Sequence, residues 1–188
     1  MQPDVDREKQ ERIIKLRYSS TIQHTFIGEY DLSRESAKAW MRAHLKGAYI
    51  NADTGEEIAI TNVGINEVLS HGSTSEAHLK SICAIPELIR DSVFIEELPN
   101  TKGTDRYDSY RYYVAGINID GENYTAKIVV GVKGDSKYYD HRLSEIEKGS
   151  LIDILNRLSN SVDVANDPEL SGIKDSKLLA ILQVVSVS

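Results

Sequence analysis

The stretch from Tyr107 to Ile146 reads YDSYRYYVAGINIDGENYTAKIVVGVKGDSKYYDHRLSEI, and its pattern predicts three consecutive antiparallel strands. The dipeptide Asp120-Gly121 separates the first two strands. It favours a two-residue hairpin turn, because both central positions of such a turn need a positive φ. With this turn, Ile119 opposes Glu122 and Arg111 opposes Val130. The stretch therefore assigns each side chain of a β-meander to one face.

The register places Arg111 on the apolar face of the meander, which we expect to meet the helices. Lys127 pairs with Val114 on the opposite face, so the two cations should not share a site unless a bulge breaks the alternation. If the second loop has four residues, Tyr139 opposes Val130. His141 then opposes Ile128 and shares the face of Arg111, with roughly 12 Å between the two α-carbons. A phosphate held between Arg111 and His141 is geometrically allowed.

The rest of the chain predicts helices and one further hairpin. Residues 36–46 have a helical apolar pattern after Ser33, and short helices follow Asn62, Ser75 and Pro86. Residues 13–18 suit a first short strand, and residues 48–50 and 57–60 flank a turn at 53–55. The predicted class is α+β, with N-terminal helices packed on an antiparallel sheet that ends in the three-stranded meander. We expect an N-terminal extension with that first strand at 1–32, a nuclease-like α+β domain at 33–150, and a tail of short helices and linker at 151–188.

Composition narrows the function classes. The chain has 188 residues and a formal net charge of −7, which argues against tight nonspecific binding to duplex DNA. Its single cysteine, Cys83, permits no internal disulfide and is expected to be a buried, inert thiol. The charged opening residues do not resemble a signal peptide, and the longest apolar run, Ile128–Val132, is too short to span a bilayer. We therefore expect a cytoplasmic protein without a membrane partner.

Several residues have the chemistry that metal-independent RNA cleavage requires. Such cleavage needs a base for the ribose hydroxyl, an acid for the leaving oxygen and cations for the phosphate. Histidine suits the first two roles and arginine the third. The predicted catalytic residues are His71, His141 and Arg111, and the predicted substrate-binding residues are His78, Lys127 and Tyr139.

Each of these residues also has an ordinary structural explanation. Arg111 could lie at the sheet rim with its stem buried, and His71 could interact with a helix dipole. His78 and Lys127 could be solvated, and Tyr139 could pack in the sheet. Glycine-rich phosphate loops, His-Glu-x-x-His helices and paired-cysteine zinc patterns are all absent from the sequence, so we expect neither a metal nor a cofactor.

A set of short motifs resembles a known family. The motifs are the run from Asn51 to Ile60, Gly64-Ile65, Leu69-Ser70-His71, Leu88, Tyr110 to Tyr113, Tyr138 to His141, and Asp175 to Leu179. Together they are similar to a phage-associated large-polyvalent-protein domain. Such domains have been grouped with the barnase–EndoU–colicin–RelE nuclease fold, in which helices precede a four-stranded antiparallel sheet. The resemblance implies a metal-independent ribonuclease or toxin-like activity, with a site drawn from His71, His78, Arg111 and His141.

The leading hypothesis is a phage or mobile-element domain that binds RNA and cleaves it by acid–base chemistry. The alternative is a noncatalytic module that interacts with a phage head or packaging protein. In that alternative, the apolar patch from Leu178 to Val187 docks on the partner. A third reading is a domain that binds a small ligand or a peptide.

Overall fold

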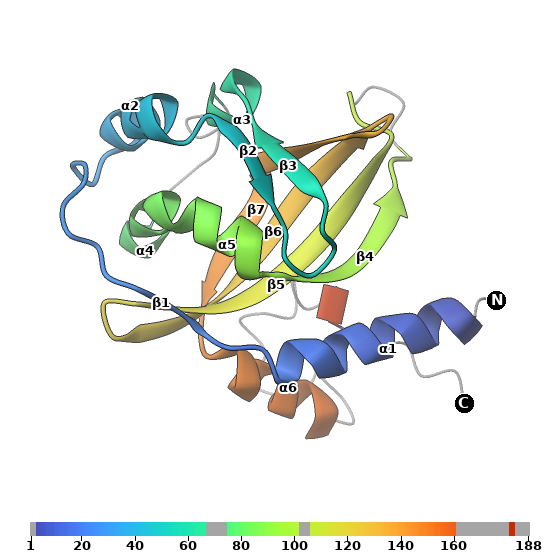
Figure 1. The fold of residues 1–188 in the computed structure, drawn as a ribbon. Helices are drawn as coiled ribbons and strands as arrows, with labels where there is room; N and C mark the ends of the chain where they lie inside the picture. The colour runs from blue at the N-terminus through green and yellow to red at the C-terminus, as the bar shows by residue number, and fades with distance from the viewer. Residues whose placement is uncertain (1–2, 67–74, 102–105, 161–180, 183–188) are drawn as a thin grey trace.

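The computed structural model describes residues 3–66, 75–101, 106–160 and 181–182, with the side chains of residues 3, 5, 141–143, 159 and 160 outside the description (Figure 1). No helix in these ranges is both long and apolar enough to cross a membrane. In chain order the elements are α1 (Pro3–Arg17), β1 (Ile22–His24), α2 (Arg34–His44), β2 (Gly47–Ile50), β3 (Glu57–Ile60), α3 (Asn62–Asn66), α4 (Glu76–Ser81), a 3-10 turn (Ile82–Ala84), α5 (Ile85–Asp91), β4 (Val93–Pro99), β5 (Ser109–Ile119), β6 (Glu122–Lys133), β7 (Ser136–Lys148) and α6 (Leu151–Asn160).

The strands form one seven-stranded sheet in the order β1-β5-β6-β7-β3-β2, with β4 also paired to β5. The α+β class is confirmed. The expectation of an antiparallel sheet is wrong in part, because β1 pairs with β5 and β3 pairs with β7 in parallel. Long connections that contain helices join the members of each parallel pair, and parallel pairing requires such connections.

The predicted register of the first hairpin is confirmed. Ile119 pairs with Glu122, Arg111 pairs with Val130, and Val114 pairs with Lys127. Asp120 and Gly121 have φ values of 52° and 92°, as the two-residue turn requires. Tyr139 also pairs with Val130, as predicted. The meander thus has the face assignment that its sequence indicates.

A bulge interrupts the ladder between β6 and β7. Val129 pairs with Asp140 and Lys127 pairs with Glu145, so Ile128 faces the four residues 141–144 of β7. The predicted pairing of His141 with Ile128 falls inside this interruption. The alternation along β6 itself is regular, and Arg111 and Lys127 therefore stay on opposite faces.

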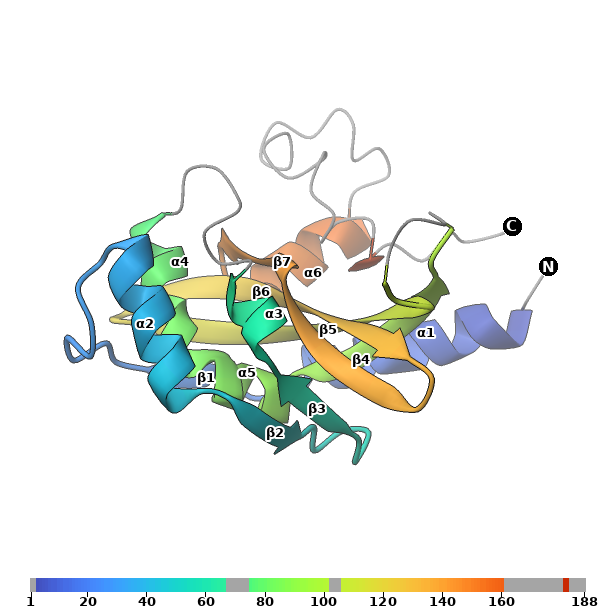
Figure 2. The same cartoon turned by 90° about the horizontal axis from the view of Figure 1, so that it is seen from above.

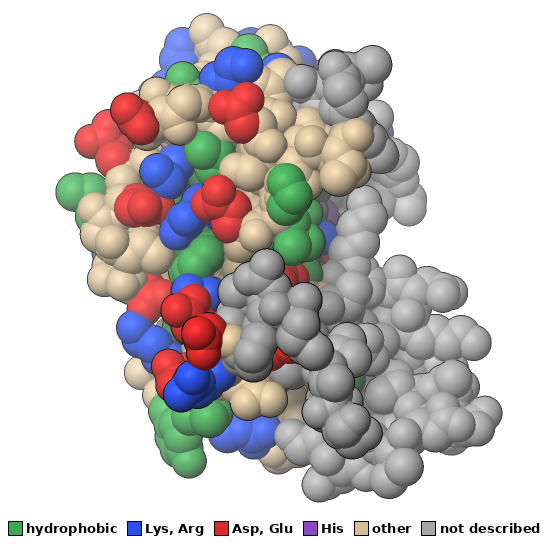
Figure 3. Space-filling view, turned by 90° about the vertical axis from the view of Figure 1, so that its right-hand side faces the viewer, with side chains coloured by type: hydrophobic (Ala, Val, Ile, Leu, Met, Phe, Trp, Pro, Cys, Tyr) green, Lys and Arg blue, Asp and Glu red, His purple; other side chains and the backbone are tan. Residues whose placement is uncertain are grey.

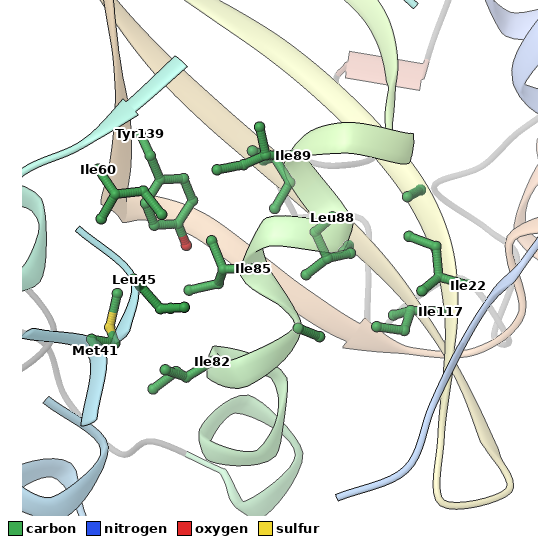
Figure 4. Packing of buried hydrophobic residues seen from close by; sticks show 14 of the residues in the cluster. Ile22, Met41, Leu45, Ile60, Ile82, Ile85, Leu88, Ile89, Ile117 and Tyr139 are labelled. Carbon is green, nitrogen blue, oxygen red and sulfur yellow. The ribbon is translucent and has the colours of Figure 1, made fainter. Parts of the chain in front are cut away.

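Helices cover both faces of the sheet (Figures 1 and 2). Buried residues of α2 and of the segment from α4 to α5 form the main core with the apolar face of the meander. In this core Tyr139 lies beside Ile60, with its hydroxyl directed toward Ile85 (Figure 4). On the other face, residues of α1 and α6 pack against Val93 and Val114. Helices on one face only were expected, and this is wrong because both faces of β5 carry buried apolar side chains.

The predicted first strand at 13–18 is also wrong, because α1 continues to Arg17. Leu16 is fully buried in the second core, and the acidic first turn and basic last turn of α1 suit the helix dipole. Ile181 and Leu182, in the apolar tail predicted to dock on a partner, are 4% exposed and pack in the same core. The other residues of that tail patch lie outside the described part of the chain.

Candidate functional site

Arg111 is held by two carboxylates and two aromatic side chains. Its guanidinium lies 2.8 Å from Glu97 and 3.2 Å from Glu56, and it donates a 3.0 Å hydrogen bond to the hydroxyl of Tyr113. It also lies 4.0 Å from the centre of the Phe94 ring. The side chain is only 12% exposed. Arg111 therefore belongs to a charge network, and a phosphate would have to displace a carboxylate to bind it.

Lys137 extends this network and was not singled out from the sequence. Its ammonium lies 3.6 Å from Glu56, which therefore lies between Lys137 and Arg111. Lys137 pairs with Val132, two positions from the pair of Tyr139 with Val130, so it shares the face of Tyr139 and Arg111. The alternation that placed Arg111 would have placed Lys137 as well. The contact with Glu56 comes from the β2–β3 turn and could not have been read from the meander alone.

Lys127 lies on the other face and is buried. Its side chain is 1% exposed, and its ammonium contacts a carboxylate oxygen of Glu145 at 2.7 Å. The structural alternative of a solvated lysine is therefore wrong. A buried ammonium is costly without a counter-charge, and Glu145 supplies a counter-charge to Lys127 in this position.

Ser144 holds the bulge of β7 in shape. Its hydroxyl accepts a 2.9 Å hydrogen bond from the backbone N–H of Val129 and donates a 2.6 Å hydrogen bond to the carbonyl of Asp140. Burial raises the pKa of Tyr139, and a contact with Ser144 opposes that rise. Bulges of this kind commonly occur next to active sites, where they redirect side chains.

His78 approaches the bulge from α4, whose first turn is capped by Ser75. Its half-buried side chain lines a cavity of about 20 Å³ with Tyr139, Ser144 and Glu145, which is room for about one water molecule. Burial lowers the pKa of His78 below its ordinary value of 6.5, and the charge of Glu145 opposes this effect. His78 is therefore held in the neutral form, which can accept a proton.

The lowered pKa of His78 predicts a pH dependence of stability. Below pH 6.5 the unfolded chain binds a proton at this residue more readily than the folded chain does, so the free energy of unfolding falls as the pH falls from 6.5 toward the folded pKa. Above pH 6.5 both states are neutral at His78 and this contribution is constant. Urea unfolding at pH 7.5 and pH 5.5 should show a larger acid-induced loss for the wild type than for His78→Gln. Equal losses would contradict the assignment.

Two of the predicted histidines cannot be placed by their side chains. His71 lies in segment 67–74, outside the described residues, which directly precedes the cap of α4. His141 is the first of the four residues in the bulge, and its side chain is also outside the description. His78 and Tyr139 thus line one cavity at the bulge, together with Glu145. Lys127 contacts Glu145 from the opposite face of the sheet, and Arg111 lies in a separate network. Glu145 and Ser144 belong to the bulge and were not predicted.

Cys83 makes a contact that the sequence did not indicate. Its sulfur lies 3.1 Å from Nε2 of His24, an arrangement that resembles a nucleophile and its base. Burial raises the pKa of Cys83 to about 11, and the thiol donates to the carbonyl of Lys80. The thiol is therefore protonated near neutrality, which supports the prediction that Cys83 is unreactive.

At the bulge, the structure brings together a carboxylate, a neutral imidazole, a hydroxyl and a buried ammonium. These groups suit proton transfer, and perturbed titratable groups in one place are typical of functional sites. Among the residues that the structure describes, no cluster of histidine, cysteine or acidic side chains is arranged to hold a metal ion.

Comparison with known proteins identifies one family. A family model described as large polyvalent protein-associated domain 3 matches residues 28–139, which is more than half of the chain. The match includes His78, Arg111 and Lys127 and ends at Tyr139, just before the bulge. Neither the curated proteins nor the solved structures contained a match. The chain belongs to the family of large polyvalent protein-associated domain 3.

Proposed function

We propose that this domain binds RNA and cleaves its phosphodiester backbone by proton transfer at the bulge of β7, without a metal ion. The observation that carries the proposal is the meeting of His78 and Glu145 at the bulge. The two side chains come from different elements, they line one cavity, and the charge of Glu145 acts on the imidazole of His78. Family membership supports a phage-associated domain. The nuclease activity is part of the proposal and follows from the resemblance described in the sequence.

The proposal gives each residue a role that follows from its surroundings. The neutral imidazole of His78 can accept the proton of a ribose hydroxyl. The Glu145 side chain is 35% exposed, so we expect an RNA strand to contact it before the other residues of the cluster. The ammonium of Lys127 contacts the Glu145 carboxylate and holds it in position. His71 and His141 remain predicted catalytic residues that exchange protons with the substrate. Arg111 remains a predicted phosphate ligand, and a bound phosphate would replace Glu56 or Glu97 as a partner of its guanidinium.

Incubation with end-labelled RNA in the presence and absence of EDTA tests cleavage. We expect fragments in both conditions, because side chains supply the chemistry. His78→Gln should reduce the cleavage rate by roughly 10²- to 10⁴-fold, the usual contribution of one general acid or base. His44→Gln is the matched control, because His44 is an exposed residue of α2 that stacks on Trp40 and should have no effect. Cleavage that EDTA abolishes, or that His78→Gln leaves unchanged, would contradict the proposal.

Glu145 needs a different design because its substitution also affects folding. The double variant Lys127→Met with Glu145→Gln removes the buried cation together with its partner, and it should fold nearly as well as the wild type. We expect this folded variant to be inactive on RNA. Wild-type cleavage by the double variant would remove Glu145 from the proposed mechanism.

A further inference from the structure

A second hollow lies at the end of the sheet, beside the turn between β6 and β7. Its volume is about 310 Å³, and it is open to solvent. It is lined by Thr61, Val63, Arg106, Tyr107, Lys133 and Tyr138. None of the predicted site residues whose side chains the structure describes lines this hollow, which is therefore distinct from the cavity at the bulge. Its volume is at the lower end of the range for ligand pockets.

Two tyrosine rings give the hollow a fixed aromatic surface. Tyr107 and Tyr138 stack with ring centres 6.1 Å apart and an angle of 30° between their planes. The Tyr107 ring rests directly on β6 at Gly131, where a β-carbon would lie 2.4 Å from the ring, so the close approach requires glycine. Asn100 donates a 2.9 Å hydrogen bond to the carbonyl of Tyr107, which fixes the backbone. The rings are therefore positioned before any ligand arrives.

Two exposed cations border these rings. The Arg106 guanidinium lies 5.4 Å from the centre of the Tyr107 ring, and the Lys133 ammonium lies 3.6 Å from Asp108. The other oxygen of Asp108 accepts a hydrogen bond from the backbone N–H of Gly134. This hydrogen bond and the charge of Lys133 lower the pKa of Asp108. Among the described residues at the hollow, the cations are Arg106 and Lys133 and the carboxylate is Asp108, which favours an anionic ligand with an aromatic part.

The wider surface does not suit a duplex. Where residues are drawn in colour in Figure 3, Lys and Arg side chains alternate with Asp and Glu side chains and form no continuous basic surface on that face. The formal net charge of −7 also opposes a long polyanion. An unpaired nucleotide needs only one ring to stack on and one or two local cations, as in single-strand binding proteins.

We propose that this hollow binds one unpaired nucleotide of single-stranded RNA, with its base stacked on Tyr138 and its phosphates beside Lys133 and Arg106. The inference rests on the proposed function in taking RNA as the ligand. In this proposal the hollow binds the RNA strand, and the residues at the bulge of β7 cleave it. Base pairing occupies the base edges and stacking covers the base faces, so a duplex offers no free face to Tyr138.

Binding of a short, fluorescent 2′-O-methyl oligonucleotide tests the inference without cleavage, because this backbone lacks the attacking hydroxyl. Anisotropy should show that Tyr138→Ala weakens binding roughly 5- to 150-fold, the range for loss of one base–aromatic stack. Tyr138→Phe keeps the ring and should bind like the wild type. Lys133→Gln should weaken binding and reduce the slope of log K against log salt by about one.

Matched controls are available at exposed positions away from the hollow. Tyr18, at the end of α1, is 81% exposed, and Lys46 is exposed after α2. Tyr18→Ala and Lys46→Gln should leave affinity unchanged. Equal losses in the control and hollow variants, equal affinity for the duplex form, or no binding by the wild type would each overturn the inference. Since Lys133 is an exposed residue at the end of β6, its variant keeps the test valid if Tyr138→Ala does not fold.

The two proposals fail in different ways. One outcome is that the protein binds the 2′-O-methyl oligonucleotide, that this binding depends on the Tyr138 ring, and that natural RNA is not cleaved. This outcome would support nucleotide binding at the hollow and contradict cleavage at the bulge. The opposite outcome is that cleavage depends on His78, while the Tyr138 and Lys133 variants change neither cleavage nor affinity. This outcome would support cleavage at the bulge and contradict nucleotide binding at the hollow.

Discussion

Replacing Glu145 with alanine is expected to lower the free energy of unfolding by about 3 kcal/mol, near the lower end of the range for breaking a buried ion pair. The variant removes the carboxylate that lies 2.7 Å from the Lys127 ammonium and leaves that ammonium in a position that is only 1% exposed. The lower end applies because Glu145 itself is 35% exposed and partly screened by water. Urea unfolding followed by far-UV circular dichroism measures the change.

The matched control for this prediction is the double variant Lys127→Met with Glu145→Ala. Methionine fills a similar volume without a charge, so the double variant should recover most of the stability that Glu145→Ala loses. A simple loss of packing at Glu145 would give the same deficit with either residue at position 127. Additive effects of the two substitutions would therefore show that the ion pair does not stabilise the bulge.

The meander was the most predictable part of the molecule. The Asp120-Gly121 turn determines the pairing of β5 with β6, and the alternation of side chains then determines which residues share a face. This local information placed Arg111, Lys127 and Tyr139 correctly in the sheet. It did not extend to the parallel partners β1 and β3. No strand was predicted at the position of β1, and for β3 the periodicity indicates that a strand is present but not which strand lies beside it.

The bulge of β7 was not predictable for a physical reason. Residues 141–144 contain neither glycine nor proline, which are the usual local signals of a break in a strand. The break is instead held by Ser144, whose hydroxyl bonds the backbone of Val129 on the neighbouring strand and of Asp140 on its own strand. Such a contact exists only after β6 and β7 have paired. The sequence can thus predict on which face of the sheet a side chain lies. It does not predict where the pairing of that strand with its neighbour is interrupted.

The partners of Arg111 show the same limit. Its face and its position far from the turn follow from the register, and both are consistent with a phosphate ligand. Its actual partners, Glu56 and Glu97, come from the β2–β3 turn and from β4, two segments distant in sequence. Charged residues on an apolar face require counter-charges, but the sequence does not identify which of its many carboxylates supplies them. The contacts of Arg111 are therefore a tertiary property of the fold.

Tyr139→Ala is expected to lower the free energy of unfolding by about 3–5 kcal/mol, the usual cost of deleting a buried aromatic ring. The side chain is 3% exposed and packs in the main core beside Ile60 (Figure 4). Tyr139→Phe keeps the ring, loses the contact of the hydroxyl with Ser144, and should cost about 1 kcal/mol. Thermal or urea unfolding of the two variants distinguishes the contributions of ring and hydroxyl.

The same pair of variants decides whether Tyr139 binds substrate, as the sequence suggested. A residue that only packs in the core should leave RNA affinity unchanged in the folded fraction of Tyr139→Ala, whereas Tyr139→Phe keeps the ring and tests the hydroxyl alone. By contrast, Tyr138 lies next in the chain on the opposite face, half-buried at the second hollow, and its ring is the one expected to contribute to affinity. Reduced affinity in a stable Tyr139→Ala protein would show that the ring meets the RNA and that its burial against Ile60 and Ile85 is not permanent. Retained affinity in the folded fraction of Tyr139→Ala, together with its marked loss of stability, would assign Tyr139 to the core, on the face of the sheet opposite to that of Tyr138.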